Sequence, residues 1–135
     1  MDKTGIHKHY LTTFTLVNEN IKCLKAGITS KFDVFDRFKE MLKDGVISNF
    51  KIHKSSWFKT WEKAYESEQR LFNEVINKFG GYNHKGEIKF HNFWTKDKYN
   101  GITEIRKYNY PEYKYMWNYL DNNGKKYLSE LKNNE

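Results

Sequence analysis

Residues 24–37, Leu-Lys-Ala-Gly-Ile-Thr-Ser-Lys-Phe-Asp-Val-Phe-Asp-Arg, decide the fold that we expect for this chain. An apolar strand ends near Gly27, and a helix follows that carries Arg37 in its first turns. Asp33 commonly caps helices, because its side-chain oxygen accepts a hydrogen bond from a backbone N–H that has no partner within the helix. The apolar stripe of this helix consists of Val34, Phe38, Met41 and Leu42, and Asp44-Gly45 is expected to end it.

The segments on either side of this stretch have the character of β-strands. Residues 8–17 and 21–28 are rich in β-branched and aromatic side chains and are separated by the polar link 18–20. Two such runs around a short polar link predict a β-hairpin. Residues 46–53 alternate between apolar and polar side chains, as a third strand would. The N-terminal half therefore predicts the order β-β-α-β.

A long helix is predicted from Thr60, as its N-cap, to Phe79, where Gly80-Gly81 ends it. Glu68 lies on the apolar side of this helix in the predicted spacing. The apolar residues at helical spacing are Trp61, Tyr65, Phe72, Val75, Ile76 and Phe79.

The C-terminal part predicts a second pair of strands and a terminal helix. Residues 87–94 and 102–108 have strand character, and Asn100-Gly101 favours a tight turn. Pro111 is suited to the first turn of a helix, and Asn122-Asn123-Gly124 is expected to interrupt that helix. The expected fold class is α+β, with a small central antiparallel sheet in a β-β-α-β-α core flanked by helices. We expect one domain over 1–135, made of a core at 8–80 and a C-terminal β-hairpin and helix extension at 81–135.

Composition limits the classes of function. Lys and Arg number 24 against 17 Asp and Glu, so the formal net charge is +7, and aromatic residues make up 18% of the chain. Cations and rings together suit binding to a nucleic-acid backbone and its bases, although the same lysines also suit a solvated surface. Cys23 is the sole cysteine, which excludes an intrachain disulfide and a thiolate metal cluster. The N-terminus lacks a secretion signal, and no apolar run approaches the length of a membrane span, so we expect a cytoplasmic protein without a membrane partner.

Two charged residues are the sharpest candidates for chemistry. A carboxylate on an apolar stripe, as predicted for Glu68, is costly to bury unless a cation meets it, and that cation is either a divalent metal or Arg37. The structural alternative is a buried ion pair or hydrogen bonds to tyrosine hydroxyls. Arg37, at the edge of its helix, is placed to hold a phosphate with two hydrogen bonds. Its structural alternative is a surface pair with Glu40 or Asp33. The five histidines show no ligand spacing typical of zinc.

Four elements of the chain, taken in order, resemble the GIY-YIG nuclease superfamily. They are Lys8-His9-Tyr10, Leu24-Lys25-Ala26-Gly27-Ile28-Thr29, Phe35-Asp36-Arg37-Phe38-Lys39-Glu40 and Ala64-Tyr65-Glu66-Ser67-Glu68-Gln69-Arg70-Leu71. The segment Lys-Ala-Gly-Ile-Thr-Ser is similar to the "KIGIT" variant found in small phage-type members. The resemblance covers about residues 8–80, and the β-β-α-β-α order agrees with that family's core.

The resemblance implies hydrolysis of DNA phosphodiester bonds with one Mg²⁺ or Mn²⁺. By position, it implies that Glu68 ligates the metal, that Arg37 stabilises the charge developing on phosphorus, and that Tyr10 orients or deprotonates the attacking water. Gly27 is expected to let the strand end approach the next helix closely, because it has no Cβ. Lys25 stands where the family pattern has a tyrosine, and the resemblance implies that it contacts phosphate or water instead.

Other positions depart from the family pattern, at Lys8-His9 and at Met41. The function that the resemblance implies is a metal-dependent DNA endonuclease acting in the cytoplasm, which is the host cytoplasm if a phage encodes the chain. The alternative is a catalytically degenerate protein of the same fold that binds nucleic acid or inhibits a host protein. Residues 81–135 are expected to add either substrate contacts or an interface between copies of the chain in a homo-oligomer.

Overall fold

The computed structural model describes residues 4–17, 20–30, 35–80 and 105–133. For Phe35, Arg37 and residues 124–133, the description is confined to the backbone.

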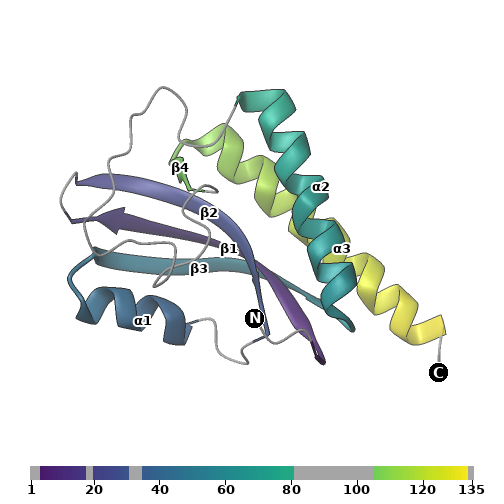
Figure 1. Cartoon of the computed structure of the whole chain (residues 1–135). Helices are drawn as coiled ribbons and strands as arrows, with labels where there is room; N and C mark the ends of the chain where they lie inside the picture. The colour runs from purple at the N-terminus through teal and green to yellow at the C-terminus, as the bar shows by residue number, and fades with distance from the viewer. Residues whose placement is uncertain (1–3, 18–19, 31–34, 81–104, 134–135) are drawn as a thin grey trace.

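The centre of the fold is an antiparallel sheet in which β1 lies between β2 and β3 (Figure 1). The four strands are β1 (His7–Leu16), β2 (Ile21–Thr29), β3 (Ile47–Phe58) and β4 (Arg106–Lys107), in the order β3-β1-β2-β4. Tyr10 on β1 stands opposite Gly27 on β2 and Ser55 on β3. This row of three residues fixes the register at the point where the predicted site lies.

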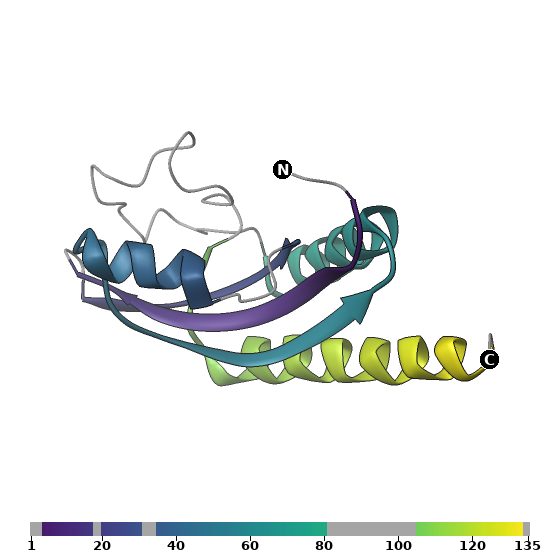
Figure 2. The ribbon, with the colours of Figure 1, turned by 90° about the horizontal axis from the view of Figure 1, so that it is seen from below.

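Side chains alternate across the sheet and form one apolar cluster on each face, as the two-residue period of a strand requires. The first cluster contains Tyr10, Phe14 and Cys23 together with Phe38 and Met41 of α1 (Phe35–Lys43). The second contains Leu11, Leu24 and Ala26 together with residues of α2 (Trp61–Phe79) and α3 (Tyr110–Asn133). Figure 2 shows α1 and α3 on opposite sides of the sheet.

The predicted α+β class and antiparallel sheet are confirmed. The boundaries of α2 also match the sequence, since Thr60 accepts a hydrogen bond from the backbone N–H of Lys63 and Gly80 caps the C-terminus with a φ of 98°. The third strand is longer than predicted and runs to Phe58. The predicted C-terminal hairpin falls mostly on residues 81–104, outside the described residues, and its described part pairs with β2 as β4.

Two sequence predictions about helices are wrong. The terminal helix is not interrupted at residues 122–124, because α3 is continuous to Asn133. The buried stripe of α2 is also rotated from the predicted one and consists of Ala64, Ser67, Leu71 and Val75. Small residues on this stripe let the helix approach the sheet, while Trp61 and Tyr65 stack on each other with ring centroids 4.8 Å apart. Tyr65 remains 42% exposed.

Within the described residues, no helix combines the length and the hydropathy that crossing a membrane demands.

Candidate functional site

Tyr10 and Lys25 meet on the face of the sheet that α1 covers. The Lys25 ammonium donates a hydrogen bond of 3.4 Å to the Tyr10 hydroxyl, and its Nζ lies 5.8 Å from the centroid of the Tyr10 ring. The two side chains are 3% and 0% exposed, respectively. Among the described residues, no carboxylate pairs with Lys25. A buried ammonium is costly unless a hydrogen bond or an opposite charge compensates it, and among the described residues the Tyr10 hydroxyl supplies the hydrogen bond.

Gly27 is required by the Tyr10 side chain. A Cβ at this position would lie 2.9 Å from the Tyr10 hydroxyl oxygen and 3.4 Å from Lys25 Nζ. The close approach therefore brings the β2 backbone to the Tyr10 phenol, whereas the sequence suggested an approach to the next helix. Three of the predicted site residues, Tyr10, Lys25 and Gly27, are thus in direct proximity.

Arg37 lies in the first turns of α1, as predicted. Phe38, the next residue, is fully buried against the sheet, and its ring meets that of Tyr10 edge to face at a centroid distance of 6.0 Å. The helix that carries Arg37 is therefore anchored directly beside the Tyr10 side chain.

Glu68 lies on α2, where its side chain is half-buried. The buried stripe predicted for it is occupied at this turn by Ser67. Because α2 packs on the second cluster, the helix that carries Glu68 covers the face opposite the one that holds Tyr10 and Lys25. The structure brings together three predicted residues and the helix of the fourth, and it places Glu68 on a separate element.

A polar cluster that sequence reasoning missed lies between β1, α2 and α3. His9 Nδ1 and Ser67 Oγ are 2.9 Å apart, Asn123 Nδ2 donates to the same oxygen at 2.9 Å, and the Tyr119 hydroxyl donates to the Ser67 carbonyl at 3.2 Å. His9 Nε2 is buried without a hydrogen-bond partner in the described part of the chain. Burial lowers the pKa of His9 to about 3, so the imidazole is neutral at pH 7. This cluster joins three elements; its His9–Ser67 contact is buried, and Tyr119 and Asn123 are partly exposed.

An exposed aromatic side chain continues the Tyr10 face. Lys8 stands opposite Trp57 on β3, two residues along β1 from Tyr10, so it points to the same side of the sheet. Its Nζ lies 4.4 Å from the centroid of the Trp57 ring, which is 40% exposed. A cation over an exposed indole ring suits contact with a nucleotide.

Cys23 is an ordinary core residue. Its thiol is fully buried, and burial raises its pKa to about 12, which removes the thiolate needed for nucleophilic attack.

The side chains available as ligands limit the kind of metal site that the chain can form. Among the described residues, no group of three or more His, Cys, Asp or Glu side chains is placed to hold an ion. Mg²⁺ in phosphate-processing sites is commonly bound through one or two carboxylates, with water and substrate phosphate as the remaining ligands. A single half-buried carboxylate such as Glu68 fits that mode of binding but not a cage made only of protein ligands.

Comparison with known proteins yields no relative: no family model matches the chain, and no curated protein or solved structure matches it significantly.

Proposed function

We propose that the chain is a metal-dependent endonuclease that hydrolyses phosphodiester bonds of DNA. The observation that carries the proposal is the contact between Lys25 and Tyr10 beside Gly27, because it joins a buried ammonium to a hydroxyl where the glycine leaves no room for a Cβ. A phosphate oxygen supplies the negative charge that this ammonium lacks among the described residues. The order β1-β2-α1-β3-α2 and the four sequence elements similar to GIY-YIG nucleases support the same function.

Each residue of the proposed site has a distinct role. Lys25 donates to the Tyr10 oxygen, which leaves the phenol proton of Tyr10 for a phosphate oxygen or for the attacking water. In this arrangement Tyr10 orients the water and Lys25 binds the phosphate. The guanidinium of Arg37 contributes two parallel hydrogen bonds to the equatorial oxygens, where negative charge grows in the transition state.

Glu68 is proposed to hold Mg²⁺ or Mn²⁺ on the strength of the sequence resemblance and not of the geometry, because its helix covers the face opposite Tyr10 and Lys25. A bound divalent ion lowers the pKa of a water ligand and neutralises charge on the leaving oxygen. Lys8 and Trp57 extend the site along the same face, where the ring is able to stack on a base next to the cleaved bond.

Plasmid cleavage tests the proposal. Supercoiled DNA is incubated with Mg²⁺ or Mn²⁺ across a range of protein concentrations, for the wild type and for Arg37→Ala, Glu68→Ala, Lys25→Met and Tyr10→Phe. We expect nicking by the wild type and a loss of about a hundredfold or more in Arg37→Ala, the magnitude typical of removing one preorganised charge donor. Equal nicking by the wild type and all four variants would mean contamination and would sink the assignment.

The chain offers matched controls on the exposed side of α2. Arg70 and Glu66 form a 3.6 Å ion pair whose side chains are 56% and 70% exposed. Arg70→Ala removes the same charge as Arg37→Ala, and Glu66→Ala removes the same charge as Glu68→Ala. We expect both controls to cleave at the wild-type rate.

A second function has its own support. Because α2 packs on the face opposite Tyr10 and Lys25, the chain also suits a non-catalytic nucleic-acid binder that uses Lys8, Trp57 and Lys25 without Glu68. Binding of a labelled duplex and a labelled single strand in EDTA, measured over a salt series, distinguishes the two functions. Salt-dependent binding that survives Glu68→Ala and weakens in Trp57→Ala, without cleavage in either metal, would favour the binder. Absence of DNA binding would point to a protein partner.

A further inference from the structure

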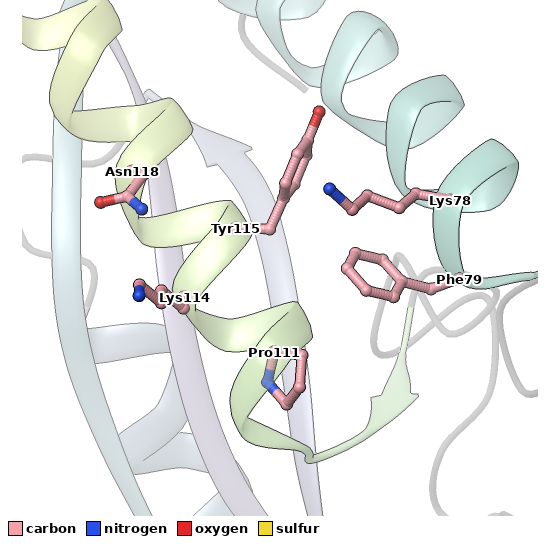
Figure 3. A pocket seen from close by; sticks show the side chains of 6 residues that line it. All are labelled: Lys78, Phe79, Pro111, Lys114, Tyr115 and Asn118. Atoms are coloured by element: carbon pink, nitrogen blue, oxygen red, sulfur yellow. The ribbon is translucent and has the colours of Figure 1, made fainter.

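A cavity of about 280 Å³ opens where the C-terminus of α2 meets the N-terminus of α3 (Figure 3). Among the described residues, its lining comes from these two helices and consists of Lys78, Phe79, Pro111, Lys114, Tyr115 and Asn118. Because α2 and α3 pack on the second cluster, this cavity lies on the opposite side of the sheet from Tyr10 and Lys25.

The two helix ends that form the cavity are fixed by buried polar contacts. Arg106 Nη1 donates to the carbonyl of Gly80, the C-cap of α2, at 2.9 Å, and its Nε donates to Glu112 of α3 at 2.8 Å. Asn109 Oδ1 accepts a hydrogen bond of 3.0 Å from the Glu112 backbone N–H and so caps α3. Arg106 therefore links both walls, and the cavity is preformed in the folded chain.

The inner walls are aromatic. The rings of Phe79 and Tyr115 meet edge to face at a centroid distance of 5.9 Å and an interplanar angle of 77°. In Figure 3, Tyr115 projects from α3 toward α2, and Phe79 lies opposite Pro111. Burial, followed by the nearby Glu74 carboxylate and its hydrogen bond, raises the pKa of Tyr115, so the phenol stays neutral. These walls offer flat, uncharged surface to a planar ligand.

Positive charge lies beside the aromatic walls. Lys78 Nζ is 4.9 Å from the Tyr115 centroid and 5.8 Å from the Phe79 centroid, and Lys114 is exposed on α3. Among the described residues, the lining includes two lysines and no carboxylate, while Glu74 hydrogen-bonds to Tyr115 from outside the lining. Lysine acts as a flexible point charge for phosphate, whereas rings bind nucleobases by stacking.

We propose that this cavity binds a nucleotide, with its base against Tyr115 or Phe79 and its phosphate at Lys78 or Lys114. An acidic peptide fits less well, because nothing in a carboxylate side chain uses the aromatic walls. A free mononucleotide and a nucleotide within a strand both present a base and a phosphate. The proposal does not depend on phosphodiester cleavage, since the cavity shares no residue with the Tyr10–Lys25 site.

Titration of the full-length, ¹⁵N-labelled chain with dAMP in EDTA tests the proposal by NMR. The amides of residues 78–79 and 114–118 are expected to shift, and the amides of β1 around Tyr10 are expected to remain unchanged. Inorganic phosphate and deoxyadenosine, titrated separately, are expected to bind at least about fivefold more weakly than dAMP, because each lacks one of the two contacts. A single-stranded oligonucleotide that binds more tightly than dAMP identifies a strand as the source, and the reverse order identifies a free nucleotide.

Variants separate the contacts from effects on folding. Tyr115→Ala is expected to weaken dAMP binding about fivefold or more, while Tyr115→Phe, which keeps the ring, binds as the wild type. Lys114→Ala changes an exposed side chain and is expected to weaken dAMP but not deoxyadenosine, and Lys39→Ala on α1 is the matched control. Shifts confined to other surfaces, or equal affinity in Tyr115→Ala, Lys114→Ala and the wild type, would overturn the proposal. Loss of cleavage in Arg37→Ala leaves these results unchanged, so the two proposals fail separately.

Discussion

His9 Nδ1 lies 2.9 Å from Ser67 Oγ, although 58 residues separate them in the chain. The contact is buried, and it is continued by Asn123 and Tyr119, so a strand and two helices meet at one hydroxyl. Asn123 also donates to the Ser67 oxygen, which has two lone pairs. His9 Nε2, the other nitrogen of the ring, has no hydrogen-bond partner among the described residues.

The low pKa of His9 predicts loss of stability in mild acid. Burial lowers this pKa from 6.5 to about 3, so between these values the unfolded chain binds a proton that the folded chain does not. Stability is therefore fully present above pH 6.5 and falls as the pH drops toward 3. The contribution lost between pH 7 and pH 5 is roughly 2 kcal/mol, measured as the free energy of urea unfolding at each pH.

His9→Asn isolates this effect, since its amide can occupy the position of Nδ1 but does not titrate. The variant is expected to be less stable than the wild type at pH 7 and to lose less stability than the wild type between pH 7 and pH 5. Identical slopes for both proteins over this range would show that other groups cause the acid sensitivity.

Gly27→Ala is expected to destabilise the fold by about 1–3 kcal/mol, the usual cost of adding a group to a packed interior. The nearest atom to the added methyl is the Tyr10 hydroxyl oxygen, at 2.9 Å. Tyr10→Phe removes that oxygen, so the cost of Gly27→Ala should fall by about 1 kcal/mol in the Tyr10→Phe background. Thermal unfolding of the two single variants and the double variant measures this coupling, and strictly additive costs would contradict the contact.

Local signals in the sequence were sufficient for the α2 boundaries and for the order of strands and helices along the core. Thr60 and Gly80 act through hydrogen bonds to residues within one turn, so their effect is readable without knowing the fold. The direction that α2 faces is decided instead by what packs against it. Trp61 and Tyr65 dominate a hydrophobicity pattern, yet they stack on each other, while the smaller Ala64 and Ser67 meet the sheet.

The polar cluster of His9, Ser67, Tyr119 and Asn123 was missed for the same reason as the orientation of α2, because contacts between distant parts of the chain determine it. His9 shares the side-chain period of Leu11 on β1, and Ser67 has the helical spacing of Leu71, which was the available signal. Pairing them requires contacts 58 residues apart, which no local pattern contains. The continuity of α3 also depends on such contacts, because Asn123 is held by Ser67 at the point where Asn and Gly favour a break.

Glu112→Ala is expected to cost about 3–5 kcal/mol, because it leaves the buried guanidinium of Arg106 without its carboxylate. Both residues of this ion pair are at least 95% buried, and Asn109 donates a further hydrogen bond to Glu112. Glu66→Ala, which breaks the exposed pair with Arg70, is the control and should change stability by less than about 0.5 kcal/mol. Urea unfolding at pH 7 measures both, and equal effects would contradict the burial of Arg106.

Two glycine substitutions are expected to change stability in opposite directions. Gly124 lies within the continuous helix α3, so Gly124→Ala should stabilise the chain by roughly 0.5–1 kcal/mol through lower backbone entropy in the unfolded state. Gly45 has a φ of 75°, and nothing lies within 4 Å of a Cβ built there, so Gly45→Ala should destabilise by about 1 kcal/mol through backbone strain alone. The urea concentration at the midpoint of unfolding measures both changes in stability, when the slope of the unfolding free energy against urea concentration equals that of the wild type. A lower midpoint for Gly124→Ala would mean that the helix bends or packs closely at residue 124, which would restore the interruption expected from Asn122-Asn123-Gly124.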